Sequence, residues 1–185
     1  MNSRKIFDRA VELGMPEMTF LDVGGGFTLV HEQKVKNFDF VAPKLNNMLE
    51  KYFPDPKVRV IGEPGRFVSE SVVYMASPII GQKVMKSGAR HYYLNNGIYQ
   101  GYSVRIFGEE QFISPLDRKI EKREKAKTTW WGQTCDSCDW IIKDKMHPVY
   151  KTGEWVFTWD HGAYHKDLTN NFNGFPLGDT HYKFD

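Results

Sequence analysis

The sequence has few of the features that mark disulfide-rich secreted proteins, membrane proteins or nucleic-acid-binding proteins. Its 185 residues include only two cysteines, Cys135 and Cys138, which lie too close together to staple a small secreted fold, so we expect a reducing, cytoplasmic setting. No apolar run approaches the length that spans a bilayer, which predicts no membrane partner. The formal net charge of +2 gives no global bias towards nucleic acid. These absences leave a globular chain long enough for one large domain or one and a half small ones.

The first third of the chain alternates helix-like and strand-like segments. Residues 3–13 and 38–53 place apolar side chains on one helical face, whereas residues 20–23 and 58–61 are short apolar strands. Helix, strand, helix and strand at this spacing predict parallel strands with helical crossovers. Because proline is tolerated in the first turn of a helix, we expect the second helix to begin close to Pro43.

The remainder of the chain is richer in aromatic and β-branched residues. Aromatic residues make up 15% of the chain, and residues 67–83 show no helical period. Further strands are expected at residues 92–94, 102–107 and 155–159, with a turn at residues 95–97 (Asn-Asn-Gly). The charged stretch 116–127 is expected to be a solvated loop or a short helix. The pattern predicts an antiparallel β domain.

Two of the strand-like segments end in turns that suit an anion. Gly24, Gly25 and Gly26 follow the first strand, where glycines let backbone N–H groups point at a phosphate. Glu63 and Arg66 follow the next strand; a carboxylate there can hold a pyridinium N–H, and a guanidinium can pair with phosphate. The alternatives are a flexible turn and a surface ion pair, and these residues alone do not decide between them.

Six stretches of the sequence occur in the order seen in one enzyme family. They are Leu-Asp-Val-Gly-Gly-Gly-Phe at 21–27, Glu-Pro-Gly-Arg at 63–66, Tyr-Leu-Asn-Asn-Gly-Ile-Tyr at 93–99, Trp-Gly-Gln-Thr-Cys-Asp at 131–136, Gly-Ala-Tyr at 162–164 and Phe-Asn-Gly-Phe at 172–175. Together they make the chain resemble the C-terminal half of eukaryotic ornithine decarboxylases, which are pyridoxal-phosphate-dependent enzymes of the alanine-racemase-like fold. The resemblance implies a mixed α/β and α+β chain. Residues 1–68 would be the last βα units of a TIM-type (β/α)8 barrel, and residues 69–185 an antiparallel β-barrel or β-sandwich domain.

The resemblance also implies roles for individual residues. Those implied to bind the cofactor, pyridoxal 5'-phosphate, are Gly24, Gly25, Gly26, Glu63, Pro64, Gly65, Arg66 and Tyr164. Cys135 would give a proton to the substrate carbon after carbon dioxide has left, across a dimer interface. Asp136 would bind the distal amine of a basic amino acid such as ornithine, whose product putrescine is a polyamine precursor.

The chain departs from the family pattern at two places. The family's Schiff-base lysine lies in an N-terminal barrel segment that has no matching stretch here, so we expect the isolated chain to be inactive. The family has a tyrosine and an aspartate that binds the distal amine, whereas this chain has Phe107 and Gly108 at those substrate-binding positions. Either Glu109 or Glu110 replaces the lost carboxylate, or the site has decayed.

Besides the possibility that the sequence is an incomplete part of a longer active enzyme, three interpretations stay open. The first is a decarboxylase chain that forms a homodimer or heterodimer with a decarboxylase subunit, and the second is a catalytically inactive homologue that serves as a regulatory or structural partner subunit. The third uses Cys135 and Cys138 as a zinc or redox Cys-x-x-Cys pair, with His147, His161 and His165 as the candidates for further zinc ligands. The resemblance instead implies no metal site and a small, buried Cys138.

Overall fold

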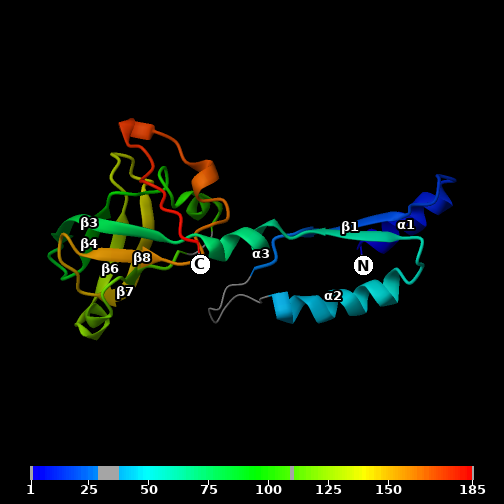
Figure 1. The fold of residues 1–185 in the computed structure, drawn as a ribbon, viewed down its shortest axis with the longest axis horizontal. Coiled ribbons are helices and arrows are strands. Elements are labelled where there is room, and N and C mark those ends of the chain that lie inside the picture. The colour runs from blue at the N-terminus through cyan, green and yellow to red at the C-terminus, as the bar shows by residue number, and fades with distance from the viewer. Residues whose placement is uncertain (1, 29–37, 109–110, 185) are drawn as a thin grey trace. The chain divides into compact units, whose positions relative to one another are not determined.

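A computed structural model describes residues 2–28, 38–108 and 111–184 (Figure 1). The chain divides into two compact units, Met1–Ser71 and Val72–Asp185, and each unit builds a sheet of its own. The first sheet has two strands and the second has six. Among the described residues, no helix combines the length and the apolar character needed to cross a bilayer.

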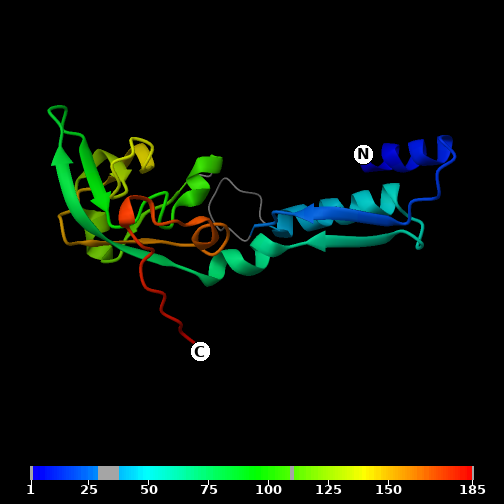
Figure 2. The same ribbon diagram turned by 90° about the horizontal axis from the view of Figure 1, so that it is seen from above.

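The first unit alternates helices and strands, as the sequence predicts. Its elements are α1 (Asn2–Glu12), β1 (Phe20–Gly25), α2 (Phe38–Tyr52), β2 (Arg59–Glu63) and α3 (Gly65–Ser69), and the 3₁₀ helix η1 (Glu70–Val72) spans the boundary to the second unit. β1 and β2 run in parallel (Figure 2). Phe20 lies opposite Arg59, and Gly25 lies opposite Glu63. Because the two strands run in the same direction, their carboxyl ends lie at one edge of the sheet.

The two longer helices of this unit meet through aromatic side chains. Phe7, buried on α1, contacts Phe53 directly after α2, with ring centroids 5.1 Å apart. Pro43 is the sixth residue of α2, so the expectation that this helix begins close to Pro43 is wrong. Proline removes the N–H that would bond to the carbonyl of Asp39, and Asp39 is exposed, so water can satisfy that carbonyl.

The second unit is built around its six-stranded sheet. Its elements are β3 (Met75–Val84), β4 (Arg90–Leu94), η2 (Ser103–Phe107), β5 (Ser114–Pro115), η3 (Arg118–Lys122), β6 (Lys125–Trp131), β7 (Trp140–Pro148), β8 (Trp155–Thr158), η4 (Lys166–Leu168) and η5 (Phe172–Gly174). The strand order is β5-β8-β3-β4-β6-β7. Neighbouring strands are antiparallel except β4 and β6, which pair in parallel. The expectation of a purely antiparallel sheet is therefore wrong at this one pair.

Residues 102–107 do not form the strand that their sequence suggests. Ser103–Phe107 is the 3₁₀ helix η2, which Gly108 closes with a left-handed φ of 84°. The Ser103 hydroxyl donates a hydrogen bond to the Ile98 carbonyl at 2.8 Å, and this bond turns the chain back on itself. Tyr102, Ser103 and Val104 are all buried, whereas consecutive residues of a strand point to opposite faces.

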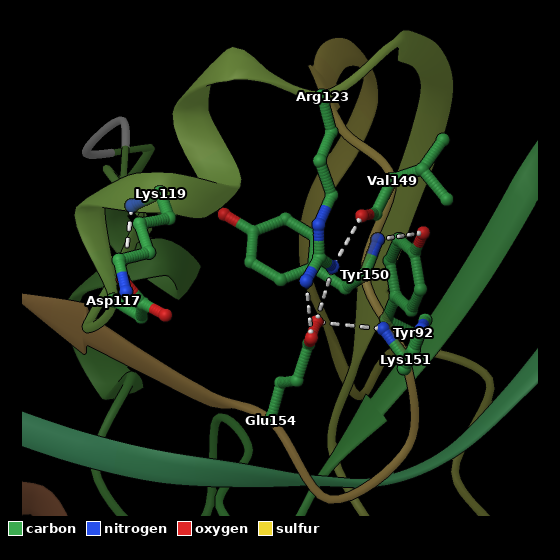
Figure 3. A network of polar contacts seen from close by, with 8 residues as sticks. All are labelled: Tyr92, Asp117, Lys119, Arg123, Val149, Tyr150, Lys151 and Glu154. Atoms are coloured by element: carbon green, nitrogen blue, oxygen red, sulfur yellow. Dashed lines mark hydrogen bonds and ion pairs between the residues drawn. The ribbon is translucent and has the colours of Figure 1, made fainter.

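The core of the second unit is aromatic. Trp130, Tyr92 and Tyr150 are buried together, and the Trp130 ring centroid lies 4.7 Å from that of Tyr92 and 5.1 Å from that of Tyr150. Figure 3 shows the Tyr92 hydroxyl accepting a hydrogen bond from the Tyr150 backbone N–H at 2.9 Å. In the same view, Arg123 donates two hydrogen bonds to the Glu154 carboxylate. This bidentate pair fixes the turn between β7 and β8 over the core.

Candidate functional site

The glycine turn of the first unit has a backbone conformation that residues other than glycine rarely adopt. Gly24 and Gly26 have left-handed φ values of 74° and 77°. Gly25 has no room for a side chain, because a Cβ there would overlap the carbonyl oxygen of Glu63. The turn and Glu63 therefore lie side by side at the carboxyl edge of β1 and β2, where the chain can approach a phosphate closely. This cradle fits a phosphorylated cofactor.

The Glu-Pro-Gly-Arg stretch continues from β2 into α3. Glu63 ends β2 with an exposed side chain, and Pro64 and Gly65 begin the helix. Arg66 donates a hydrogen bond from Nη1 to Oε1 of Glu70 at 3.0 Å, and Glu70 is only 5% exposed. Arg66 is thus held in place by a buried carboxylate, whereas Glu63 presents its carboxylate at the surface of this unit.

In the second unit, the loop between β6 and β7 carries Cys135 and Asp136. The backbone N–H and the thiol of Cys135 both donate to the Asn173 side-chain oxygen, at 3.2 and 3.3 Å. The Tyr99 hydroxyl donates a short hydrogen bond to Oδ2 of Asp136. Cys138 donates its backbone N–H to Oδ1 of the same carboxylate at 2.8 Å. A thiol and an oriented carboxylate therefore lie next to each other on one loop.

The Asp136 carboxylate and the Tyr99 hydroxyl shift each other's protonation. The hydrogen bond from Tyr99 is the main cause that lowers the pKa of Asp136, and the backbone N–H of Cys138 and the positive charge of Arg105 add to it. The same hydrogen bond raises the pKa of Tyr99 to about 12. Asp136 is therefore ionised at neutral pH and suits a cationic ligand.

Asp139 holds the loop between β6 and β7 in place through hydrogen bonds. Its carboxylate is almost fully buried and accepts hydrogen bonds from the Ile98 backbone N–H and from the backbone and hydroxyl of Thr134, at 2.8, 3.0 and 2.7 Å. A Cβ at Gly97 or Gly132 would overlap its oxygens. The glycines at these two positions therefore make room for the carboxylate that orients the loop.

The predicted substrate residues Phe107 and Gly108 end the helix η2. Phe107 is mostly exposed, and Gly108 closes the helix. From the same helix, Arg105 donates a short hydrogen bond to the Cys138 carbonyl, which links η2 to the loop of Cys135 and Asp136. Glu109 and Glu110, the expected substitutes for the lost aspartate, lie outside the described residues.

Tyr164 belongs to the segment after β8. It has a left-handed φ of 61° and is half exposed. Its neighbours His161 and His165 are buried, with ring centroids 3.7 Å apart. The glycine turn and Glu63 belong to the first unit, whereas Cys135, Asp136 and Tyr164 belong to the second. The structure brings the glycine turn close to Glu63, and Cys135 lies next to Asp136 on one loop.

The Cys-x-x-Cys interpretation finds no support in the geometry. Cys135 and Cys138 are both free and both exposed, so the expectation of a buried Cys138 is wrong. His147 bonds to the Thr128 hydroxyl through Nδ1 at 2.6 Å. Across the described ranges, no three metal-ligating side chains gather into a group that could hold a metal ion.

The structure adds four residues to those that sequence reasoning assigned a role: Tyr99, Arg105, Asp139 and Asn173. Tyr99 and Asn173 fall within two of the six stretches that match the family, so the resemblance could have indicated a role for them. Asp139 and Arg105 act through backbone groups far away in the sequence, so no local pattern reveals them.

Comparison with known proteins extends these observations. Residues 1–70 match a family described as pyridoxal-dependent decarboxylase, pyridoxal binding domain, and so coincide with the first unit to within one residue. The chain is 32% identical over 182 residues to the chloroplastic ornithine decarboxylase of Nicotiana glutinosa, covering 94% of this chain and 41% of that protein. It is 31% identical over 194 residues to antizyme inhibitor 2 of Xenopus laevis, covering 98% and 42%. The arginine decarboxylase of Paramecium bursaria Chlorella virus, solved with agmatine, aligns with a TM-score of 0.79 at 30% identity, covering 95% of this chain and 46% of that one.

The chain is therefore related to the pyridoxal-dependent decarboxylases, a class whose cofactor is pyridoxal phosphate. Within this class, its similarity to ornithine decarboxylases extends over nearly all of its length, which confirms the resemblance seen in the sequence. The chain spans about two fifths of the length of the curated relatives that it matches.

Proposed function

We propose that this chain forms part of a pyridoxal-phosphate-dependent decarboxylase of basic amino acids such as ornithine. The observation that carries the proposal is the parallel pairing of β1 and β2, which sets Gly25 against Glu63. A phosphate cradle and a carboxylate then face the same edge of the sheet. The similarity to ornithine and arginine decarboxylases supports the substrate class.

The first unit would hold the cofactor. When bound, pyridoxal phosphate accepts the electron pair released as the substrate carboxylate leaves. The residues proposed to bind its phosphate are Gly24, Gly25, Gly26, Pro64, Gly65 and Arg66, together with Tyr164 of the second unit. Glu63 would accept a hydrogen bond from the protonated ring nitrogen and so keep the ring positively charged.

The loop between β6 and β7 would bind the substrate and return a proton to it. The Cys135 thiol would return a proton to the substrate carbon, since it is exposed and already oriented by Asn173. Asp136 would bind the distal ammonium of the substrate, because Tyr99 and the Cys138 backbone keep its carboxylate ionised and fixed. With Gly108 in place of a carboxylate, Asp136 carries this recognition among the described residues.

The fold supports an assembly larger than this chain. Within the described residues, neither β1 nor β2 pairs with a further strand, so each keeps an unpaired edge. We infer that the first unit is the last part of a (β/α)8 barrel and that other barrel strands cover these edges. The second unit would be the β domain that follows the barrel, and a decarboxylase subunit would be the partner of a dimer.

A second candidate function is that of an inactive partner subunit. The observation that favours it is the pair Phe107 and Gly108, which replaces the family's tyrosine and aspartate. A relative of similar identity is named antizyme inhibitor rather than decarboxylase. In this role the chain would keep the fold and pair with an active subunit without turning over substrate.

A chimera tests the two functions. This chain would replace the matching two fifths of the Nicotiana glutinosa ornithine decarboxylase, and carbon dioxide release from ornithine, lysine and arginine would be measured. We expect release from at least one of them, and we expect Cys135→Ala to lower the rate by about 10²–10⁴-fold, as befits loss of a general acid. Visible absorbance of bound cofactor would show that the chimera is loaded.

One result decides against the decarboxylase, and a second then tests the inactive partner. A cofactor-loaded chimera that releases no carbon dioxide would overturn it. The inactive partner would then be supported if size-exclusion chromatography with light scattering shows this chain in a stable complex with full-length ornithine decarboxylase. Asp144→Asn, on an exposed residue of β7, is the matched control and should leave the rate unchanged.

A further inference from the structure

We propose that Arg105 is a positioning residue for Asp136, that it acts through the loop residue Cys138, and that it thereby sets how tightly the distal ammonium of a basic amino acid is bound. The inference rests on the proposed function, in which Asp136 binds that ammonium. Arg105 lies on η2, 33 positions before Cys138 in the chain, and none of the six stretches that match the family includes it.

The Arg105 guanidinium is held against Trp140, the first residue of β7. Its central carbon lies 3.9 Å from the centroid of the Trp140 ring, where the electron-rich ring face attracts a cation. Held there, the guanidinium donates a short hydrogen bond from Nη2 to the Cys138 carbonyl. The contact with the ring therefore fixes the direction in which Arg105 donates.

Cys138 passes this restraint on to Asp136. The backbone N–H of Cys138 donates to Oδ1 of Asp136 at 2.8 Å, so a displacement of Cys138 would carry this donor away from the carboxylate. The Cys138 carbonyl also accepts a hydrogen bond from the Trp140 backbone N–H at 2.8 Å. That bond joins residues two apart and leaves the loop free of η2, whereas the bond from Arg105 ties the loop to another element and is charge-assisted, hence the stronger of the two.

The positive charge of Arg105 adds a direct effect on the carboxylate. The pKa of Asp136 is lowered mainly by the hydrogen bond from Tyr99, then by the Cys138 backbone N–H, and further by the charge of Arg105. Among the described residues, Arg105 makes no ion pair with Asp136. Because the guanidinium donates to a carbonyl instead, the carboxylate is oriented and ionised and still accepts a cationic ligand.

The first test uses the 185-residue chain and needs no activity. The NMR signal of the Cys138 backbone N–H would be followed through the acid titration of Asp136. Arg105→Met keeps the aliphatic stem and loses the charge and the donors, so we expect the signal to shift at neutral pH and the midpoint to rise. Arg105→Lys keeps a charge and a donor and should lie between Arg105→Met and the parent. Arg118→Met, on an exposed residue of η3, is the matched control and should match the parent.

Two results of this titration would overturn the positioning role. One is a midpoint in Arg105→Met equal to that of the parent, and the other is an equal effect of Arg105→Met and Arg105→Lys, which would indicate packing alone. If Arg105→Met does not fold, Arg105→Gln takes its place, because its amide keeps a donor and loses only the charge. Its midpoint should still rise, and an unchanged midpoint would again overturn the role.

A second measurement separates this inference from the proposed function. In the chimera with the Nicotiana glutinosa enzyme, Arg105→Met should raise the KM for ornithine about tenfold and change kcat by less than about threefold, because the distal ammonium is bound equally in the ground state and the transition state. An unchanged KM in an active chimera would overturn the positioning role and leave the decarboxylase function in place. A cofactor-loaded chimera without activity would overturn that function instead, and the titration of Cys138 would still decide whether Arg105 positions Asp136.

Discussion

The buried carboxylate of Asp139 accepts a hydrogen bond from the backbone N–H of Ile98 at 2.8 Å, although the two residues are 41 positions apart in the chain. Its second oxygen takes two hydrogen bonds from Thr134. One side chain thereby ties the turn after β4 to the loop that carries Cys135 and Asp136. The geometry of the candidate substrate loop therefore depends on a contact that is distant in sequence as well as on local ones.

The first prediction tests this anchor. Asp139→Ala should lower the free energy of unfolding by about 3–5 kcal/mol, because it strands three donors that now bond to a buried charge. Urea denaturation of the parent and the variant would measure the change. Asp144→Asn is the matched control, since Asp144 is exposed and pairs with Lys127 at the surface, and it should cost less than about 1 kcal/mol. Similar losses in both variants would contradict the anchoring role.

The second prediction concerns the hydrogen bond from Tyr99 to Asp136, which needs an ionised carboxylate and a protonated phenol. The pKa of Asp136 is lowered by folding, so this stabilisation is present above its unfolded value of about 3.9 and is lost as the pH falls through the folded value. The pKa of Tyr99 is raised from 10.0 to about 12, so the stabilisation is full below pH 10 and is lost as the pH rises towards 12. Tyr99→Phe should therefore be most destabilising between about pH 5 and 9.

The measurement is a double-mutant cycle with Asp136→Asn, followed by urea denaturation across the pH range. We expect a coupling between the two residues at neutral pH that shrinks at both extremes. A coupling that does not change with pH would show that the two side chains act by packing rather than through the hydrogen bond.

Much of the fold could be predicted from local patterns. The period of apolar residues indicates α1 and α2, and the apolar runs indicate β1, β2, β4 and β8, because each of these patterns is contained within a single stretch of sequence. The strand expected at residues 102–107 fails because Ser103 bonds back to Ile98, which is a tertiary contact. The helix α3 has five residues, too few to show a period. The parallel pairing of β4 and β6 depends on long-range topology, which no window of sequence reports.

The candidate site also contains residues that could be predicted from the sequence and residues that could not. The glycine turn and the Glu-Pro-Gly-Arg stretch are contiguous and could be read directly from the sequence, and so could Cys135 and Asp136. Their supports could not, because Asn173 reaches Cys135 from 38 positions away and Arg105 reaches Cys138 from 33. The sequence therefore names groups that carry chemistry, while the fold decides how each group is oriented and protonated.

The third prediction concerns His147, whose pKa is lowered to about 4 by burial and by the positive charges of Lys125 and Lys145. The folded chain keeps this imidazole neutral, with Nδ1 bonded to the Thr128 hydroxyl. The unfolded chain binds a proton below about pH 6.5, so stability is full above that pH and falls as the pH drops towards 4. The slope for one proton is at most about 1.4 kcal/mol per pH unit.

His147→Gln should flatten this acid limb, which urea denaturation between pH 4 and 8 would measure. The burial of His161 lowers its pKa too, so part of the slope should remain in the variant. His181→Gln is the matched control, because His181 is exposed, and it should keep the full slope. A variant curve parallel to that of the parent would exclude His147 as a source of the acid sensitivity.

The last prediction tests the cradle on which the proposed function depends. Gly25→Ala should destabilise the first unit by more than about 2 kcal/mol, because its Cβ would overlap the Glu63 carbonyl and push β1 from β2. Gly65→Ala is the matched control in the adjacent turn, since it has open space and an ordinary φ and lies in α3, where alanine is the better helix former. We expect it to be neutral or to stabilise by up to about 1 kcal/mol. Hydrogen exchange of the β1 and β2 amides would locate the effect, and equal protection in both variants would show that the close approach of Gly25 to Glu63 does not hold the two strand ends together.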